Sequence, residues 1–325
     1  MKNACILLGC ILAISAASLE AADINYTDKL GRQVNIPVPV KKAVIFQTTE
    51  LIPVLGIWDK VVGVGRFAYD SDILKAAKPD IASRIPCAGS GAEVNIEAIL
   101  KADPDLVVAW SYYPDQVKFM ESKGLRVMAL YLDSIPEMYD VMRLHGKLFA
   151  REKKIDDAIS RMEEIFNLIK QRTAKIPPDK RKKVLWLYGK PTQVAGRLDL
   201  QVALINLIGG NNAAATINTR TAEVSKEQII TWNPDVIFVW GNAKYDTQTI
   251  LNNPQWRHVG AVKNGMVYKA PKWSTWSPRL APLALWMAKR TYPDYYRDVD
   301  LIKTTDSFMR KVFGVPYANV AKFRD

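Results

Sequence analysis

Histidine and cysteine are scarce in this chain. Its 325 residues include two histidines and three cysteines, and only Cys87 lies beyond the first 22 residues. One thiol cannot form an internal disulfide, so the fold must depend on its packed core. No pair among Cys87, His145 and His258 has the spacing of a zinc site. The sequence therefore predicts no metal site and no cofactor.

Catalytic motifs are also missing. The chain contains neither G-x-S-x-G nor H-E-x-x-H, so we predict no catalytic residues and no enzymatic activity. Residues 63–68 match the dinucleotide pattern G-x-G-x-x-A, but no helix follows at once and the acidic residue expected about 20 positions later is missing. We interpret this segment as a strand end that leads into a loop. An exported enzyme on the same fold is the less favoured alternative.

A concentrated basic surface is lacking, although the formal net charge is +12. The basic residues are scattered, and the one run, at residues 180–183, follows two prolines and reads as a solvated loop or helix end. No stripe of lysine and arginine and no nucleic-acid-binding module accompanies it. The sequence therefore predicts no nucleic-acid partner.

The first 22 residues have the three-part pattern of a signal peptide. Lys2 supplies the positive charge, residues 6–17 form an uncharged apolar stretch, and small residues follow. The stretch is shorter than the roughly 20 apolar residues of a membrane span. Cys10 follows a lipobox-like Leu7-Leu8-Gly9, but too few residues precede it for a lipoprotein signal. We predict export to the periplasm without a lipid anchor at Cys10.

One sequence pattern occurs twice, 130 positions apart. Residues 95–110 read NIEAILKADPDLVVAW, and residues 225–240 read SKEQIITWNPDVIFVW. In the alignment of the two copies, Glu97 corresponds to Glu227 and Trp110 to Trp240. Each copy predicts a short helix, a Pro-Asp turn and a buried strand that ends in tryptophan. The separation is too long for the 20–50 residue period of a solenoid. The repeat indicates two similar lobes.

The remaining pattern predicts an α/β fold. Apolar strand-like runs alternate with helical segments in residues 23–134 and 178–325, which is typical of parallel sheets covered by helices. Between them, residues 135–177 are helical, and the segment from 152 to 175 would span about 35 Å at 1.5 Å per residue. We expect a signal peptide (1–22), an N-terminal lobe (23–134), a helical region with an interlobe helix (135–177) and a C-terminal lobe (178–325). A ligand cleft would lie between the lobes.

The chain resembles the periplasmic binding proteins for iron-siderophores, haem and vitamin B12, which are the helical-backbone receptors of ABC importers. The residues that carry the resemblance are GRQVNIP, LGIWDKVVGV, both repeat copies, LIGGNN at 207–212, WRHVGAVKNGMVYKAP at 256–271 and WSPRLAPLALWMAKRTYP at 276–293. They cover nearly all of the chain after the signal peptide, in the family's order. The resemblance implies two Rossmann-like lobes with central parallel sheets, joined by one long helix, that close by only a few degrees.

The resemblance also implies how the protein meets its transporter. Glu97 and Glu227 match the paired glutamates, one per lobe, that family members present to arginines of the membrane permease dimer. Two anions on similar lobes suit a two-fold symmetric partner. Each glutamate would otherwise be an acid stabilised by a helix N-terminus. The expected partner is an ABC permease dimer in the inner membrane, and the receptor itself is expected to be a monomer.

Candidate ligand-binding residues follow from the rule that open α/β sheets bind ligands at the carboxyl ends of their strands. Aromatic walls suit a bulky chelate, and guanidinium groups suit its anionic centre. The predicted residues are Thr48, Thr49, Arg66, Tyr69, Trp110, Tyr112, Tyr188, Arg197, Trp240 and Trp273. Arg279 is expected to brace the turn at Ser277 instead.

The ligand class remains open between two kinds. A ferric siderophore or haem-like chelate is preferred, with a corrinoid next. A small oxyanion such as molybdate or tungstate is the alternative, because Thr48, Thr49 and backbone N–H groups could hold it without a large cavity.

Overall fold

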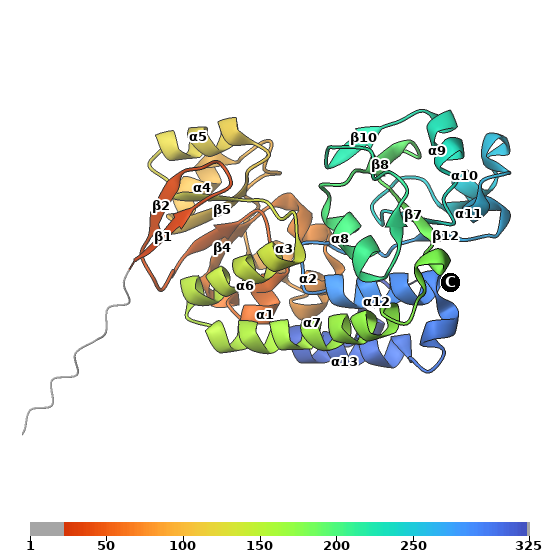
Figure 1. Ribbon diagram of the computed structural model, residues 1–325. Coiled ribbons are helices and arrows are strands. Elements are labelled where there is room, and N and C mark those ends of the chain that lie inside the picture. Colours follow the sequence, from red (N-terminus) through yellow and green to blue (C-terminus); the bar gives the residue numbers. More distant parts are fainter. Residues whose placement is uncertain (1–22, 324–325) are drawn as a thin grey trace, which may run out of the picture.

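Two larger β-sheets and a short hairpin form the framework of the protein in the computed structural model, which describes residues 23–323 (Figure 1). The predicted signal peptide and Cys10 lie outside the described residues. The chain opens with a hairpin, in which strands β1 (Ile24–Thr27) and β2 (Gln33–Ile36) pair antiparallel. The buried Asp28 carboxylate accepts the backbone N–H groups of Leu30 and Arg32 and so closes the turn.

The N-terminal sheet is parallel, as predicted, with strand order β4-β3-β5-β6. Its strands are Val- and Ile-rich and buried on both faces, which is the pattern of a sheet covered by helices on either side. They are β3 (Ala43–Ile45), β4 (Val61–Val64), β5 (Leu106–Trp110) and β6 (Val127–Leu130). The helices of this lobe are α1 (Leu51–Leu55), α2 (Asp72–Ala77), α3 (Ile81–Arg84), α4 (Ile96–Ala102) and α5 (Pro114–Ser122).

The C-terminal sheet is mixed rather than wholly parallel. Strands β7, β11, β12 and β9 run parallel, whereas β8 folds back antiparallel on β7 and β10 pairs antiparallel with β8. Residues 188–192 turn the chain directly from β7 into β8, and such a short connection permits only antiparallel pairing. The strands are β7 (Lys183–Leu187), β8 (Gln193–Ala195), β9 (Asn211–Asn212), β10 (Thr221–Glu223), β11 (Val236–Val239) and β12 (Val267–Lys269).

Short helices cover the second sheet, as Figure 1 shows around α8 and α9. They are α8 (Leu200–Leu207), α9 (Lys226–Trp232), α10 (Thr247–Leu251) and α11 (Gly260–Lys263). Single 3-10 turns occur at Trp58–Lys60, Arg66–Asp70, Pro178–Lys180, Pro254–Trp256, Pro293–Tyr296 and Tyr317–Asn319. The Gly63–Ala68 segment thus ends β4 and enters a 3-10 turn, and a side chain at Gly65 would meet Phe46 at 3.2 Å.

Four long helices form a base beneath both lobes, at the bottom of Figure 1. They are α6 (Ile135–Phe149), α7 (Glu152–Thr173), α12 (Leu280–Thr291) and α13 (Leu301–Phe313). The first two are separated at Ala150, which caps α6 in the left-handed conformation. Helix α7 is about 33 Å long at 1.5 Å per residue. It contacts α1 of the N-terminal lobe and α8 of the C-terminal lobe, so it connects the two.

The C-terminal helices do not stay within the C-terminal lobe. Helix α13 packs on α7 and also contacts α1, and α12 lies along α7. One apolar cluster therefore runs through both lobes and the base, and it includes Met162 of α7, Trp286 of α12 and Phe308 of α13. Two smaller clusters lie on the other face of each sheet, under α4 and α5 and under α9 to α11. Within residues 23–323, no helix is both long enough and apolar enough to cross a membrane.

Candidate ligand-binding site

Several aromatic side chains meet where the strands of the two sheets end. Trp110 is the last residue of β5, Tyr131 follows β6, Tyr188 follows β7 and Trp240 follows β11. Carboxyl ends of parallel strands share one sheet edge, so the topology itself gathers these rings. The edge of each lobe that faces the other is therefore lined by aromatic groups.

We call Trp110, Tyr112, Tyr131 and Trp276 the interlobe cluster. The ring centroid of Trp276, from the loop between β12 and α12, lies 4.7 Å from Trp110 and 4.7 Å from Tyr131. Tyr112 packs edge-on against Tyr131 at 5.0 Å. Rings in such tilted and edge-to-face contacts attract each other beyond the effect of their burial. The cluster thus joins the N-terminal lobe to a loop of the C-terminal half.

An ion pair crosses between the lobes beside this cluster. Arg220, just before β10, donates hydrogen bonds from Nε and Nη2 to the two carboxylate oxygens of Asp133, at 2.5 and 2.8 Å. Its guanidinium also lies 4.5 Å from the centroid of the Tyr131 ring. Burial alone would raise the pKa of Asp133, but Arg220 and Lys29 outweigh it and lower that pKa. The carboxylate is therefore ionised and paired.

A second polar group lies on the C-terminal side. The Tyr188 hydroxyl lies 2.8 Å from both carboxylate oxygens of Asp199 and from Oε1 of Gln201. Asp199 also caps α8, and the Gln201 amide donates to Thr275 Oγ1. Burial raises the pKa of Asp199 to about 6, and the nearby Asp133 adds to that shift. Burial likewise raises the pKa of Tyr188, so its phenol stays a neutral donor.

Polar residues after β3 form a small buried group. Thr48 has a left-handed backbone (φ 59°), and its Oγ1 lies 3.1 Å from Nε2 of His145 on α6. Burial lowers the pKa of His145 to about 4, so this imidazole is neutral at pH 7. The side-chain amide of Gln47 is buried, and neither of its polar atoms has a hydrogen-bond partner among the described residues. Thr49, next along the chain, is half-buried.

Of the ten predicted ligand residues, Trp110, Tyr112, Tyr188 and Trp240 come together at or near the interlobe contact. Trp240 packs edge-on against Tyr188 at 6.0 Å. Arg66, at the start of a 3-10 turn, and Arg197, in a loop, are both exposed, and Arg197 donates to Asn218. The Tyr69 hydroxyl donates a hydrogen bond to the Ile85 carbonyl within its own lobe.

Trp273 requires a correction. Only 2% of it is exposed, and its indole N–H donates to the Ala321 carbonyl while its ring packs on Phe323. The C-terminal segment covers this tryptophan, so it forms part of the core rather than a ligand surface. The sequence rule failed because it placed the residue near a strand end without foreseeing the tail.

Arg279 does support the loop that carries Trp276, as expected. Its backbone N–H donates to Ser277 Oγ, and its buried guanidinium pairs with Glu50 and with Asp72, the latter at 2.7 Å. The Asp72 carboxylate also accepts the backbone N–H of Ala321. This buried ion triad ties α1 and α2 of the N-terminal lobe to the start of α12.

Sequence reasoning missed Tyr131, Asp133, Asp199 and Arg220. Tyr131 and Asp133 directly follow β6, so the strand-end rule applied to that strand would have found them. Asp199 precedes a recognisable helix, which is an N-cap signal. Arg220 lies in a loop, and nothing in the sequence marks it. Within residues 23–323, no three His, Cys, Asp or Glu side chains are grouped as a metal site would need.

Glu97 and Glu227 occupy the first turns of α4 and α9 and are exposed. The turns after both helices also match. Asp105 accepts the N–H of Lys42 before β3, and Asp235 accepts the N–H of Lys183 at the start of β7. The 130-residue repeat is thus a repeat in three dimensions.

Three comparisons with known proteins agree with this architecture. MolA, the molybdate-binding protein of Haemophilus influenzae, is 26% identical over 98% of both chains, and its molybdate-bound structure superposes with a TM-score of 0.78 over 91% of this chain and 99% of that one. The vitamin B12-binding protein of Yersinia pestis is 27% identical over 63% of this chain and 69% of its own. CeuE of Helicobacter pylori, solved with Ni-His, has a TM-score of 0.81 and 25% identity over 91% of this chain and 97% of its own.

The match to a family model settles the class. The model of the periplasmic binding proteins covers residues 46–273, from the end of β3 to the loop after β12. It spans both copies of the repeat and the long connecting helix. The fold class predicted from the sequence is confirmed, as is the expected role of substrate-binding protein for an ABC importer. The chain belongs to the periplasmic binding protein family.

Proposed function

We propose that this protein captures a metal chelate with an organic shell, such as a ferric siderophore, a haem-like complex or a corrinoid, and delivers it to an ABC permease dimer. The interlobe cluster is the observation that carries the proposal. Three of its rings lie at or just after the ends of strands β5 and β6 of the N-terminal lobe, and the fourth, Trp276, comes from the loop between β12 and α12. A flat or bulky ligand would replace the contacts that they now make with one another.

Charge at the contact supports an organic shell over a bare anion. Arg220 is already paired with Asp133, and Asp199 adds a second carboxyl group nearby. A small dianion would need several unpaired donors there. A chelate that presents aromatic or aliphatic surface would need fewer, because the rings supply most of its contact.

The other functional residues take their roles from this placement. Trp110, Tyr112, Tyr131, Tyr188, Trp240 and Trp276 form the proposed ligand walls, and Arg220 can bind an anionic group of the ligand once Asp133 releases it. Arg66 and Arg197, exposed at the rim, would attract an anionic chelate. Glu97 and Glu227 would dock the loaded receptor, as a monomer, on the permease. Export by a cleaved signal peptide and the absence of enzymatic activity belong to the same proposal.

Molybdate is the second candidate because of one structural observation and one comparison. The buried Gln47 amide has no protein partner among the described residues and lies beside Thr48 and Thr49 after β3. Such a group is costly unless something binds it. The similarity to MolA, which covers 98% of both chains, points the same way.

Binding measurements on the purified chain distinguish the candidates. Haemin, a ferric catecholate, a ferric hydroxamate, cobalamin and molybdate would be titrated in turn while the melting temperature and the tryptophan fluorescence are followed. A chelate that binds should lose affinity at least about tenfold in Trp110→Ala and in Trp276→Ala, because each removes an aromatic wall. Trp58→Phe, a half-buried tryptophan outside the interlobe cluster, is the control.

Binding of molybdate alone, weakened by Gln47→Leu but not by Trp276→Ala, would replace the chelate proposal with the oxyanion. Turnover of any of these compounds would contradict a pure binding role.

A further inference from the structure

Helices α4 and α9 match each other position by position. The side chain of Asn95 accepts the N–H of Ala98 at 3.1 Å, and that of Ser225 accepts the N–H of Gln228 at 3.1 Å. Both helices end on a residue in the left-handed conformation, Asp103 (φ 48°) and Asn233 (φ 46°). The two helices therefore begin and end alike, and side chains 130 positions apart point in corresponding directions.

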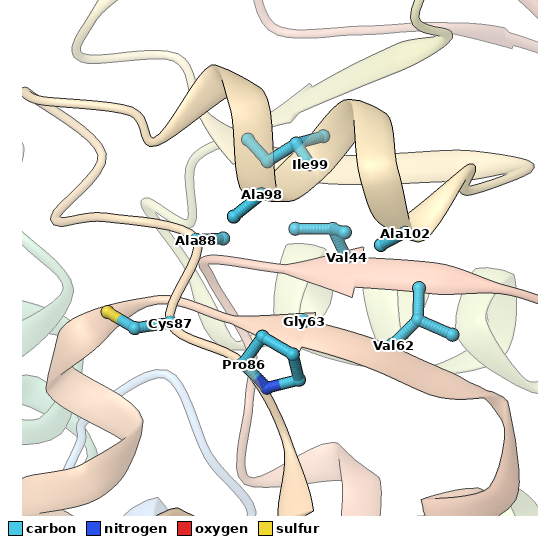
Figure 2. Close-up of a pocket in the computed structure, with 9 residues that line it drawn as sticks. All are labelled: Val44, Val62, Gly63, Pro86, Cys87, Ala88, Ala98, Ile99 and Ala102. Carbon is cyan, nitrogen blue, oxygen red and sulfur yellow. The ribbon is translucent and has the colours of Figure 1, made fainter.

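The inner face of each helix is firmly packed. Ile99 of α4 and Ile229 of α9 are 1% and 0% exposed. Figure 2 shows Ala98, Ile99 and Ala102 of α4 above Val44 of β3, and the space between them leaves no room for a water molecule. Helix α4 is held in place by this packing, so its outer face is a fixed surface.

The outer face of each helix carries a large apolar side chain. Leu100 is 44% exposed and Ile230 is 39% exposed. Each comes three residues after its glutamate and so lies on the same helix face as Glu97 or Glu227. A single exposed leucine is ordinary on a protein surface. The same combination at both copies of the repeat is not explained by the packing of either lobe.

We propose that Leu100 and Ile230 extend the docking surface of Glu97 and Glu227, so that each lobe presents an acidic group and an apolar side chain together. The inference rests on the proposed docking function. The partner it fits is a two-fold pair of permease surfaces, each with a cationic side chain beside an apolar recess. Two similar contacts on one chain match two identical subunits.

The two parts of each contact have different physical roles. Exposed carboxylates steer association and fix orientation, and their contribution weakens as salt rises. Burial of an apolar side chain adds affinity that depends little on salt. A receptor with both parts holds the permease even at an ionic strength where the charges alone are screened.

The test measures binding of the receptor to the importer's permease–ATPase complex in lipid nanodiscs, across a series of salt concentrations. Leu100→Ser/Ile230→Ser should weaken binding about tenfold or more while the salt dependence stays as in the wild type. Glu97→Gln/Glu227→Gln should weaken binding and flatten the salt dependence. Ile302, 57% exposed, lies on α13, a helix that Figure 1 shows far from α4 and α9, and Ile302→Ser should change neither the binding nor its salt dependence.

The apolar contribution of Leu100 and Ile230 and the docking role of the two glutamates can fail independently in this test. If the glutamate variant loses binding and the apolar variant does not, the inference is wrong and the docking role of the glutamates stands. If neither variant loses binding, or the wild type does not bind the complex, the proposed docking function is wrong as well. Melting temperature and ligand affinity should stay unchanged in both double variants, because all four side chains are exposed and lie outside the interlobe cluster.

Discussion

Arg220 of the C-terminal lobe donates hydrogen bonds to both carboxylate oxygens of Asp133 after β6, at 2.5 and 2.8 Å, while its guanidinium lies over the ring of Tyr131. The pair lies beside the interlobe cluster, whereas the buried ion triad of Arg279 ties the lobes together near the base. The lobes are thus fastened at two places of different character. The half-exposed pair can open in water, and the buried triad cannot open without leaving charges unpaired.

We predict that Asp133→Asn opens the ligand-free protein. An exposed pair contributes only about 0–1 kcal/mol, so the melting temperature should fall by little, but the open population should rise several-fold. Distances between spin labels on the two lobes would measure this. Arg310→Gln, which breaks an exposed pair with Asp306 within α13, is the control and should leave the distances unchanged. An unaltered distance distribution in Asp133→Asn would show that the pair between Asp133 and Arg220 does not hold the lobes closed.

Asp199 should make the protein less stable as pH rises. Its pKa is raised from 3.8 to about 6 in the folded protein, so the folded state binds a proton more tightly than the unfolded state. The stability it gives is complete below about pH 4 and is lost through pH 6, an effect of about 3 kcal/mol. Urea unfolding of Asp199→Asn should therefore show a gain relative to wild type at pH 7 that vanishes at pH 4. A gain that is independent of pH would contradict the assignment.

His145 should act in the opposite direction. Burial lowers its pKa from 6.5 to about 4, so the folded state resists protonation. The stability from the neutral imidazole is present above about pH 6.5 and is lost as pH falls through 4, again by about 3 kcal/mol. His145→Gln should lack this acid-side loss.

Removal of one member of the buried ion triad should strongly reduce the free energy of unfolding. Arg279→Met leaves Glu50 and Asp72 without their cation and should reduce the free energy of unfolding by about 3–5 kcal/mol. Arg279→Met/Glu50→Gln should recover part of that loss, because one of the buried charges is then removed. Thermal or urea unfolding measures both. Equal stability of the single and double variants would show that the carboxylates are solvated instead.

The lobes and the long helix were predictable because they depend on local patterns. The repeat of residues 95–110 at 225–240 predicted two lobes, and the apolar spacing from Ile155 to Ile169 predicted α7 almost to its last residue. Trp110 and Tyr188 do lie at the carboxyl ends of β5 and β7, and their role in ligand binding stays a prediction. The strand-end rule depends only on the parallel order of the strands and not on side-chain detail.

The contacts between distant segments were not predictable. Trp273 is buried because residues 317–323 fold over it, and no periodicity in the sequence reports where a tail will lie. Arg220 meets Asp133 across 87 positions, and either residue alone looks like an ordinary surface charge. The short turn from Gly189 to Thr192 makes the next strand antiparallel, but β8 itself (Gln193–Ala195) has only three residues and is too short to show a strand pattern in the sequence.

The order of the base helices along the chain has a consequence for folding. Helix α7 is complete midway through the sequence, but α12 and α13, which cover its apolar stripe, come last. The apolar face of α7, on which the N-terminal lobe rests, is therefore covered only after the C-terminal helices have been added. The two lobes should not fold as independent units, since a single apolar cluster belongs to both. The protein should unfold in one cooperative transition. Removal of α13 from the C-terminus should also destabilise the N-terminal lobe, because α13 contacts α1 and α7.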